Sequence, residues 1–313
     1  MSGNVSPLPW TGNKACISDS LLAFMPQHDI YIEPCCGSAE FLLSKPKVKR
    51  EIINDYNGDV VNFFRVIQHN KAFVNFNGRI MCSANSESIF NSNKVRLAQP
   101  FSPVEILTDE DRALDVTDEE LDRAVAFYEN QLYSFCSTGK SFAIDNRSPM
   151  SKLARVWYAN LRLQGVCILN RDYKRVILEQ SKNNCFIFID PPYRGTEKYY
   201  NNIDFAEEEH ARLFETMGAI DKKFNGSCKF LITYNHDPVI VSYAEKYGFD
   251  MHVVKRLHNM AQSTNPGAMF EELIIANYDL QAQATANQKY IFEESRQLSF
   301  FDNDYYNTGG IVQ

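Results

Sequence analysis

Short apolar runs alternate with segments of helical spacing at both ends of the chain, and this alternation constrains the fold more than any other sequence feature. The apolar runs predict strands at residues 29–33, 51–54, 185–189, 229–233 and 272–276. Helices are predicted to begin near residue 38 and to cover residues 59–68, 207–220 and 238–247. Such alternation is typical of a parallel sheet covered by helices on both faces. We therefore predict a doubly wound α/β sheet.

Between these two groups of predicted strands and helices, at residues 72–162, the amino-acid composition changes to stretches rich in asparagine and serine. We predict one domain over residues 1–71 and 163–280, interrupted by an inserted, mainly helical module over 72–162. After residue 278 the sequence turns polar, which predicts a flexible C-terminal tail over 281–313. No internal repeat is found.

The distribution of charge along the chain is more informative about binding partners than the net charge. The chain has 313 residues, a formal net charge of −7 and a pI of about 5.5, which by itself argues against a nucleic-acid partner. However, nine acidic residues and one basic residue lie between 105 and 122, whereas nine basic and three acidic residues lie between 140 and 182. The basic stretch could bind phosphates despite the negative net charge of the chain. The alternative is that these basic residues form an ordinary solvated surface.

The eight cysteines form no Cys-x-x-Cys pair and have no histidine spacing suited to zinc, so we predict free thiols and no metal site. No apolar stretch of roughly 18 residues occurs, and the first residues lack an export signal. We expect a cytoplasmic protein with no membrane contact.

The most informative motif is Asp190-Pro191-Pro192-Tyr193, which directly follows the apolar run 186–189. Ligands of open α/β sheets collect outside the carboxyl ends of strands, so Asp190 is a candidate site carboxylate. Two consecutive prolines remove two backbone donors and leave a stiff turn rich in acceptors. The Tyr193 ring offers a surface on which a planar base could stack. An ordinary turn after a strand is the alternative for this motif alone.

This turn suits one specific chemical problem. The exocyclic nitrogen of adenine is a poor nucleophile because its lone pair is delocalised into the ring. Asp190 and a carbonyl near Pro191 could accept its two hydrogens, localise that lone pair and favour in-line attack on an electrophilic methyl group.

A second motif lies at the end of the first predicted strand. Glu33-Pro34 followed by Gly37 predicts a tight turn at the start of a helix, where the backbone can approach a ligand closely. Asp55, eighteen positions after Gly37, closes the second strand, where a carboxylate can bind ribose hydroxyls. The Gly-x-Gly-x-x-Gly fingerprint is absent, so a nucleoside without a pyrophosphate fits better than a nicotinamide cofactor. A plain turn with a helix cap is the alternative for either segment.

Together these motifs resemble the Dam-type N6-adenine DNA methyltransferases, which depend on S-adenosylmethionine. Four segments carry the resemblance, namely Pro9-Trp10-Thr-Gly-Asn-Lys14, Glu33-Pro34-x-x-Gly37, Asn170-Arg-Asp172-Tyr and Asp190 to Tyr193. It covers most of residues 7–278 and is weakest in the insert. The departures are Asn13, Cys35 and Ala39, which stand where that family usually has Gly, Phe and Gly.

The resemblance implies a Rossmann-like methyltransferase sheet with S-adenosylmethionine as the cofactor. The cofactor-binding residues it implies are Trp10, Lys14, Glu33, Cys35, Gly37, Asp55, Asp172 and Asp190. The catalytic residues it implies are Asp190, Pro191, Pro192 and Tyr193, acting on an adenine that is extruded from double-stranded DNA.

The inserted module is implied to read the DNA sequence. Its candidate phosphate contacts are Arg147, Lys152, Arg155 and Arg162. The recognition sequence, the oligomeric state and a cognate endonuclease of a restriction-modification system stay open. When bound to DNA, the protein is expected in the nucleoid.

The C-terminal tail carries a separate motif. Gln297-Leu298-Ser-Phe300-Phe301 resembles the pentapeptide with which bacterial replication proteins dock on the sliding clamp. Leu298 and the two phenylalanines could enter a preformed groove, with Gln297 as a polar anchor. We therefore expect the clamp as a partner, and a terminus that packs on the protein itself is the alternative.

Other functions stay open at this point. Methyltransferases of RNA bases or of a protein glutamine tend to carry Asn-Pro-Pro-Tyr, and N4-cytosine enzymes more often carry Ser in the first position. A DNA-binding, clamp-associated regulator with an inactive site is the alternative from another class. Methyl transfer to duplex DNA, with Asp190→Ala as the control, separates the two classes.

Overall fold

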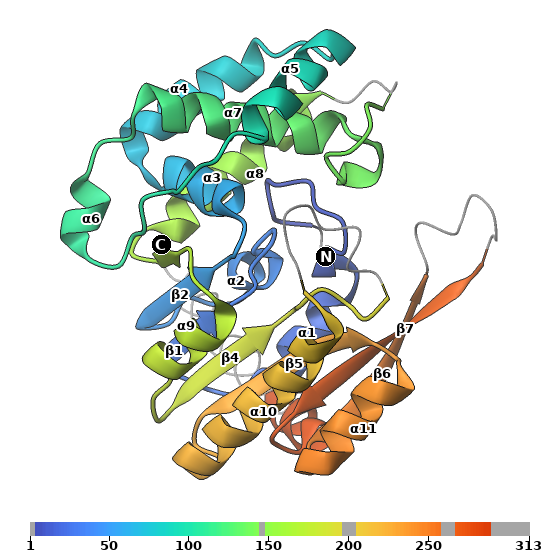
Figure 1. Ribbon diagram of the computed structural model, residues 1–313. Coiled ribbons are helices and arrows are strands. Elements are labelled where there is room, and N and C mark those ends of the chain that lie inside the picture. Colours follow the sequence, from blue (N-terminus) through green and yellow to red (C-terminus); the bar gives the residue numbers. More distant parts are fainter. Residues whose placement is uncertain (1–3, 144–147, 196–204, 258–266, 289–313) are drawn as a thin grey trace, which may run out of the picture.

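The computed structural model describes residues 4–143, 148–195, 205–257 and 267–288 (Figure 1). Seven strands form one mixed sheet. Their spatial order is β3 (Cys167–Leu169), β2 (Arg50–Asn54), β1 (Ile30–Glu33), β4 (Cys185–Ile189), β5 (Lys229–Asn235), β7 (Met269–Ala276) and β6 (Asp250–Leu257). The first five run parallel, whereas β7 runs antiparallel to both of its neighbours. The predicted α/β architecture is confirmed.

Two strands were missed by the sequence analysis, and both lie at an edge of the sheet. β3 has only three residues, too few for a pattern to emerge. β6 mixes apolar with polar and charged residues and lies at an edge, so it lacks the continuous apolar run of the central strands.

Helices cover both faces of the sheet, because the central strands are apolar on both sides. On one face, Phe186 and Phe188 of β4 pack with α1 (Ser18–Phe24), α2 (Glu40–Ser44) and α3 (Gly58–Gln68). On the other face, Ile187 and Ile189 pack with α9 (Tyr173–Gln180), α10 (Glu207–Phe224) and α11 (Pro238–Tyr247). This alternation of side chains along β4 makes the sheet doubly wound.

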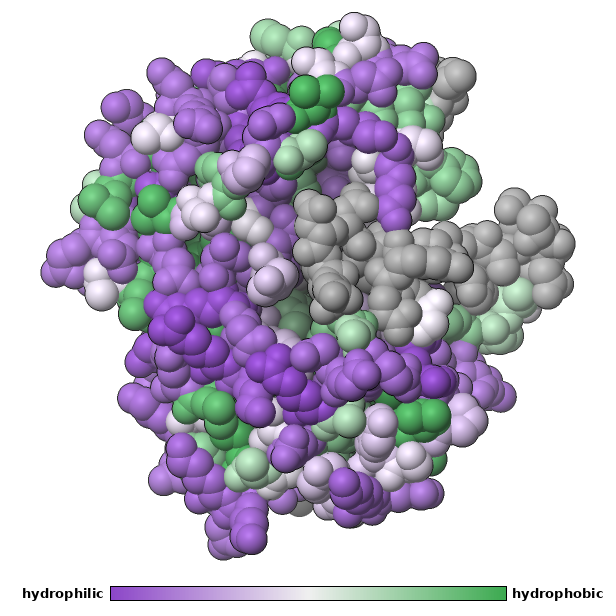
Figure 2. Space-filling model, viewed as in Figure 1, coloured by the Kyte–Doolittle hydropathy of each residue, from purple (hydrophilic) through white to green (hydrophobic). Residues whose placement is uncertain are grey.

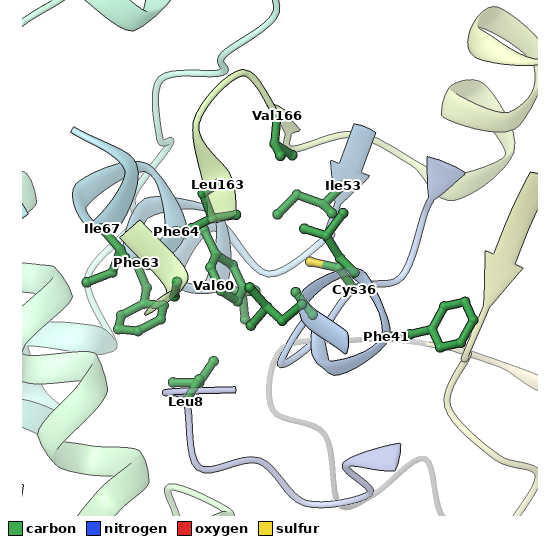
Figure 3. Packing of buried hydrophobic residues seen from close by; sticks show 14 of the residues in the cluster. Leu8, Cys36, Phe41, Ile53, Val60, Phe63, Phe64, Ile67, Leu163 and Val166 are labelled. Atoms are coloured by element: carbon green, nitrogen blue, oxygen red, sulfur yellow. The ribbon is translucent and has the colours of Figure 1, made fainter. Parts of the chain in front are cut away.

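The segment between β2 and β3 is mainly helical and extends the first of these layers. It contains α4 (Asn70–Met81), α5 (Glu87–Leu97), α6 (Asp109–Ala113), α7 (Asp118–Tyr133) and α8 (Leu153–Leu163). Figure 1 shows α4, α5 and α7 gathered at the top of the view, with the sheet below. Phe63 and Phe64 of α3 share one core cluster with Leu163 of α8 and Ile53 of β2 (Figure 3). Phe76 of α4 and Tyr128 of α7 belong to the same cluster, so the insert packs continuously onto the sheet rather than around a core of its own.

Helix capping explains much of the acidic run. Thr108 and Thr117 cap α6 and α7, and three acidic residues follow each of them in the first turn. Negative charge is favourable at a helix N-terminus, so these carboxylates stabilise their own helices. Figure 2 shows polar side chains over most of the same view, with hydrophobic residues in small separate groups.

Residues 280–288 form a helix, which corrects the prediction of a flexible tail from residue 281. Leu280 and Ala284, one turn apart, are buried against the first layer. The Asn287 side chain donates to the carbonyl oxygens of Ala23 and Met25 at 2.7 and 2.9 Å. Two buried apolar residues and two hydrogen bonds thus dock this helix. No helix in the described part of the chain is long and apolar enough to span a membrane.

Three 3-10 turns complete the described elements. They are η1 (Lys14–Ile17), η2 (Phe135–Ser137) and η3 (Pro149–Lys152). Asn13 caps η1 by accepting a hydrogen bond from the backbone nitrogen of Ala15 at 2.7 Å. The turn η1 thereby brings Lys14 to the carboxyl ends of the strands.

Candidate active site

A cavity of about 200 Å³ lies at the carboxyl ends of β1, β2 and β4. The helices that follow β1 and β4 cover opposite faces of the sheet, so the strand order reverses between these two strands. Such a reversal leaves a crevice in which ligands of α/β proteins bind. All eight residues predicted to bind the cofactor line this cavity: Trp10, Lys14, Glu33, Cys35, Gly37, Asp55, Asp172 and Asp190.

The turn after β1 is built around Gly37. Its φ of +46° is one that L side chains rarely adopt, and a Cβ atom at this position would lie 2.7 Å from Nε1 of Trp10. Gly37 is therefore required both by its conformation and by the close approach of the indole. Two residues on, Ala39 also adopts a left-handed conformation, with φ of +51° at the start of α2. The family that the sequence resembles has glycine here, and alanine costs about 1 kcal/mol in this conformation.

Asp55 is fixed by backbone donors on both sides. Its Oδ2 atom accepts from the nitrogen of Gly37 at 2.8 Å, and its Oδ1 atom accepts from that of Asn57 at 2.8 Å. Burial raises the pKa of Asp55 to about 6, because these two hydrogen bonds offset the desolvation only in part. The carboxylate thus links the turns after β1 and β2 at one wall of the cavity.

Asn54, the last residue of β2, holds three loops together. Its amide nitrogen donates to the carbonyl oxygens of Pro34 at 2.8 Å and Arg171 at 2.9 Å, and its Oδ1 atom accepts from the backbone nitrogen of Arg171. The sequence analysis missed this residue. The sequence did offer a clue, because Asn54 is a polar residue at the end of an apolar strand, and a buried amide side chain almost always forms hydrogen bonds.

Asp190 directly follows β4 and faces the cavity. Its Oδ2 atom lies 2.6 Å from Nζ of Lys14, and its Oδ1 atom accepts from the Thr233 hydroxyl at 2.8 Å. The side chain is 23 % exposed, so its carboxylate keeps an accessible edge. Burial raises the pKa of Asp190 above its ordinary value, although the charge of Lys14 opposes this. Asp190 is therefore oriented by two donors and still open to a third.

The rest of the motif divides between the cavity and the core behind it. Pro192 lines the cavity, and within the described residues no hydrogen bond reaches the Pro191 carbonyl oxygen. Tyr193 is only 8 % exposed, its hydroxyl donates to Glu272, and Nζ of Lys14 lies 4.9 Å from its ring centroid. The stacking role of Tyr193 stays a prediction, since the ring lies behind the cavity wall.

Glu33 is a buried carboxyl group at the floor of the cavity. The Tyr31 hydroxyl donates to its Oε2 atom at 2.6 Å. Burial raises the pKa of Glu33 to about 8, so the group is mainly protonated at neutral pH and can donate a hydrogen bond into the cavity.

The far wall comes from residues that the sequence analysis largely missed. Asp172 caps α9 and lies 3.1 Å from Nη1 of Arg212, which itself lines the cavity. Besides Trp10, five aromatic residues line the same cavity: Phe41, Tyr56, Tyr173, Phe188 and Phe205. Their spacing is that of ordinary core aromatics, so no pattern in the sequence marked them.

Unlike the predicted cofactor residues, the residues predicted to contact phosphates are not all placed where they could do so. Lys152 and Arg155 lie half-buried at the start of α8, and Arg147 lies outside the described residues. Arg162 is buried, and its guanidinium contacts the Glu51 carboxylate at 2.5 and 2.7 Å. This placement contradicts the phosphate-binding role predicted for Arg162. The reason is helical periodicity, since Arg162 shares the inner face of α8 with Val156, Ala159 and Leu163.

The predicted clamp-binding residues are Gln297, Leu298, Phe300 and Phe301, and they lie outside the described residues.

Comparison with known proteins identifies the family. A search of curated proteins found no match. The model of the D12 class N6 adenine-specific DNA methyltransferases matches residues 10–260, a range that contains every cavity-lining residue. It also favours adenine in DNA over the other amino groups considered above. The chain belongs to the D12 class of N6 adenine-specific DNA methyltransferases, and the reaction of this class is methylation of adenine N6 in DNA.

Proposed function

We propose that the cavity binds S-adenosylmethionine and that Asp190 holds the target adenine for site-specific methylation of double-stranded DNA. One observation carries the proposal: at the reversal point of the sheet, a carboxylate oriented by Lys14 and Thr233 keeps an exposed edge beside a cavity of nucleoside size. The family match supplies the reaction, and the geometry suggests which residues perform it.

The chemistry of the lining fits this cofactor. Its acidic groups suit a ligand with a positively charged sulfur and an amino group, and Asp55 stands where a ribose is bound in α/β folds. Trp10 and Gly37 lie in close contact, and both line the cavity. When bound, S-adenosylmethionine supplies a methyl group on a positively charged sulfur, which makes that carbon the electrophile.

Asp190 would act on the amine of the adenine. Its exposed carboxylate edge accepts one amine hydrogen, and the Pro191 carbonyl oxygen, which accepts no hydrogen bond in the described residues, accepts the other. Lys14 and Thr233 prevent the carboxylate from rotating away. Because burial raises the pKa of Asp190, its carboxylate can also receive the proton that the amine releases after methylation.

The adenine must leave the duplex to reach Asp190. We infer that Tyr193 stacks on the extruded base and that Lys152 and Arg155, with Arg147, contact the phosphates. Arg162 is excluded from this set because it is committed to Glu51.

Transfer of a tritiated methyl group to long duplex DNA of mixed sequence tests the proposal. Asp190→Ala should lower incorporation by about three orders of magnitude, since oriented acceptors of this kind are worth roughly 10²–10³ in rate. Asp190→Asn keeps the size of the side chain but loses its charge, and should be nearly as impaired. Asp29→Asn, an exposed carboxylate at the amino end of β1, is the matched control and should retain full activity. Equal incorporation by wild type and Asp190→Ala would refute the role of Asp190.

We also propose that the C-terminal residues 297–301 bind the bacterial sliding clamp. The support is the sequence Gln297-Leu298-Ser-Phe300-Phe301 alone. Removal of residues 295–313 leaves the docked helix 280–288 in place, so it should abolish clamp binding and preserve methylation of short duplexes. Unchanged clamp binding by the truncated protein would end this idea.

A further inference from the structure

Glu272 on β7 is fully buried directly behind the catalytic motif, in a place that the sequence analysis did not single out. Its Oε1 atom accepts from the Tyr193 hydroxyl and lies 3.6 Å from Nζ of Lys14. Its Oε2 atom accepts from Nε of Arg256 at 2.8 Å. A charged group so far from water persists only where its partners repay the desolvation.

Lys14 is shared between two carboxylates. Its Nζ atom lies 2.6 Å from Asp190 and 3.6 Å from Glu272, and it also donates to the carbonyl oxygen of Gly12 at 2.7 Å. Together with Arg256, these side chains form a cluster of two cations and two carboxylates. Burial would raise the pKa of Glu272, but the charges of Lys14 and Arg256 outweigh it and hold this pKa below its ordinary value.

We propose that Glu272 is a positioning residue for methyl transfer, which orients the Tyr193 ring through its hydroxyl and draws part of the Lys14 charge away from Asp190. The inference rests on the proposed roles of Asp190 and Tyr193. Glu272 does not line the cavity, so it acts on the reaction only through these neighbours.

The Tyr193 ring needs such an anchor because of its place in the chain. It follows two prolines that contribute no backbone donor. The Lys14 ammonium group lies 4.9 Å from the centroid of the ring, and the centroid of the Tyr234 ring lies 5.7 Å from it. The hydrogen bond from its hydroxyl to Glu272 fixes the position of the outer end of the ring, which neither of these two contacts holds directionally. A base that stacks on Tyr193 is placed correctly against Asp190 only if the position of the ring is fixed.

The charge of Glu272 also tunes Asp190 as an acceptor. If Lys14 paired with Asp190 alone, its full charge would bind the carboxylate oxygens that the amine must reach. The groups that face Asp190 come from several elements: Lys14 of η1, Glu33 of β1, Thr233 of β5, Glu272 of β7 and Tyr193 of its own loop. Among them, Glu272 is the negative neighbour that raises the pKa of Asp190 through its charge most directly.

A purely structural role for Glu272 is the competing explanation, and the chain offers a matched control. Glu51 on β2 is also buried between a lysine and an arginine, with Lys45 at 2.6 Å and Arg162 at 2.5 Å. Glu51 does not line the cavity. If Glu272 only holds the sheet together, its replacement should resemble that of Glu51 in every measurement.

The experiment compares full-length Glu272→Gln and Glu51→Gln in methyl transfer at saturating S-adenosylmethionine, over a pH series, beside thermal unfolding. We expect Glu272→Gln to lower kcat by about 10- to 100-fold, as a misplaced reacting group does, with less than about a threefold change in cofactor affinity. The acidic limb of its kcat profile should move to lower pH, because loss of the negative neighbour lowers the pKa of Asp190. Glu51→Gln should unfold earlier but keep the wild-type kcat and pH profile.

Two outcomes overturn the inference. One is a pH profile and kcat of Glu272→Gln that match those of Glu51→Gln. The other outcome concerns Tyr193→Phe, which also serves if Glu272→Gln fails to fold. This variant keeps all four charges of the cluster and removes only the hydroxyl. A kcat within twofold of wild type in Tyr193→Phe would refute the orienting role. An inactive wild type would instead contradict the proposed function. If the wild type is active and Asp190→Asn is inactive, a normal kcat of Glu272→Gln would contradict the positioning role alone.

Discussion

Two buried glutamates, Glu51 and Glu272, have the same kinds of partner at opposite ends of the sheet. Glu51 lies at the amino end, beside Lys45 and Arg162, and Glu272 lies at the carboxyl end, beside Lys14 and Arg256. The difference lies in what else the cations touch. Arg162 comes from α8, so its pair with Glu51 ties the inserted helices to β2. Lys14 instead reaches past Glu272 to Asp190, whose carboxylate is open to the cavity.

The pKa of both buried glutamates is lowered, whereas the pKa values of three carboxyl groups that line the cavity are raised. At the amino end, burial works to raise the pKa of Glu51, but hydrogen bonds from Arg162 and Lys45 outweigh it and lower that pKa. At the carboxyl end, burial raises the pKa of Glu33, Asp55 and Asp190 because their partners compensate it only in part. Groups with partly compensated charge are the ones that a ligand can still stabilise. We therefore call the amino end of the sheet, where Glu51 is fully paired, the closed end. We call the carboxyl end, where the cavity carboxyl groups can still pair with a ligand, the open end.

The largest effect is expected at the closed end. Arg162→Ala would leave Glu51 buried with one cation fewer, which typically costs about 3–5 kcal/mol. We expect the free energy of unfolding in urea to fall by that amount, while kcat of the folded protein stays near wild type.

Arg155→Ala, on the half-buried side of the same helix, is the control and should cost much less. If Arg162→Ala kept wild-type stability but weakened DNA binding and its salt dependence, the assignment of Arg162 to the closed end would be wrong.

The next effect is expected at the open end. Gly37→Ala would place a Cβ atom 2.7 Å from the Trp10 indole and force alanine into a left-handed conformation. Strain of this kind costs about 1–3 kcal/mol, so we expect the affinity for S-adenosylmethionine to fall by roughly 10- to 100-fold, measured by calorimetry.

Gly248→Ala provides the matched case at the other end. Gly248 ends α11 with φ of +68°, and a Cβ atom there would meet nothing within 4 Å. It should lose about 1 kcal/mol of stability and no cofactor affinity. Equal losses of affinity in the two variants would show that Trp10 does not form the cavity wall in solution.

The same division explains what could be predicted from the sequence. Asp55 and Asp190 follow directly after strands and Gly37 lies in the turn after β1, so position along the chain was enough to single out these three cavity residues. Thr233 and Glu272 could not be found in this way. Their roles depend on which strands are neighbours, and β7 reaches β5 only through an antiparallel return.

At the closed end, charge alone was misleading. Arg162 belongs to a basic stretch, and it was predicted to face phosphates because nothing in its charge reveals which side of α8 it occupies. The apolar residues Val156, Ala159 and Leu163 did carry that information through their helical spacing. Likewise, the helix 280–288 was missed because its apolar residues, Leu280 and three alanines, alternate with polar ones and show no helical spacing.

The smallest effect is a pH dependence that only the open end should show. Asp55 has a pKa of about 6, raised by burial. Its ionised form accepts hydrogen bonds and carries negative charge, so affinity for the cationic cofactor should be constant above that pH and should fall below it, by at most about tenfold per pH unit. Calorimetric titration between pH 5 and pH 7.5 measures this, in a window that stays below the pKa of about 8 of Glu33.

Asp55→Asn should bind more weakly throughout and lose the pH dependence, whereas Glu51→Gln should bind as the wild type does at every pH. The two variants together decide the cause. A slope that survives in Asp55→Asn would assign the titration to another carboxyl group of the cavity, and Asp190 would be the first to test. A slope that disappears in Glu51→Gln would mean that the two ends of the sheet are electrostatically coupled, and the separation of a closed end from an open one would then fail.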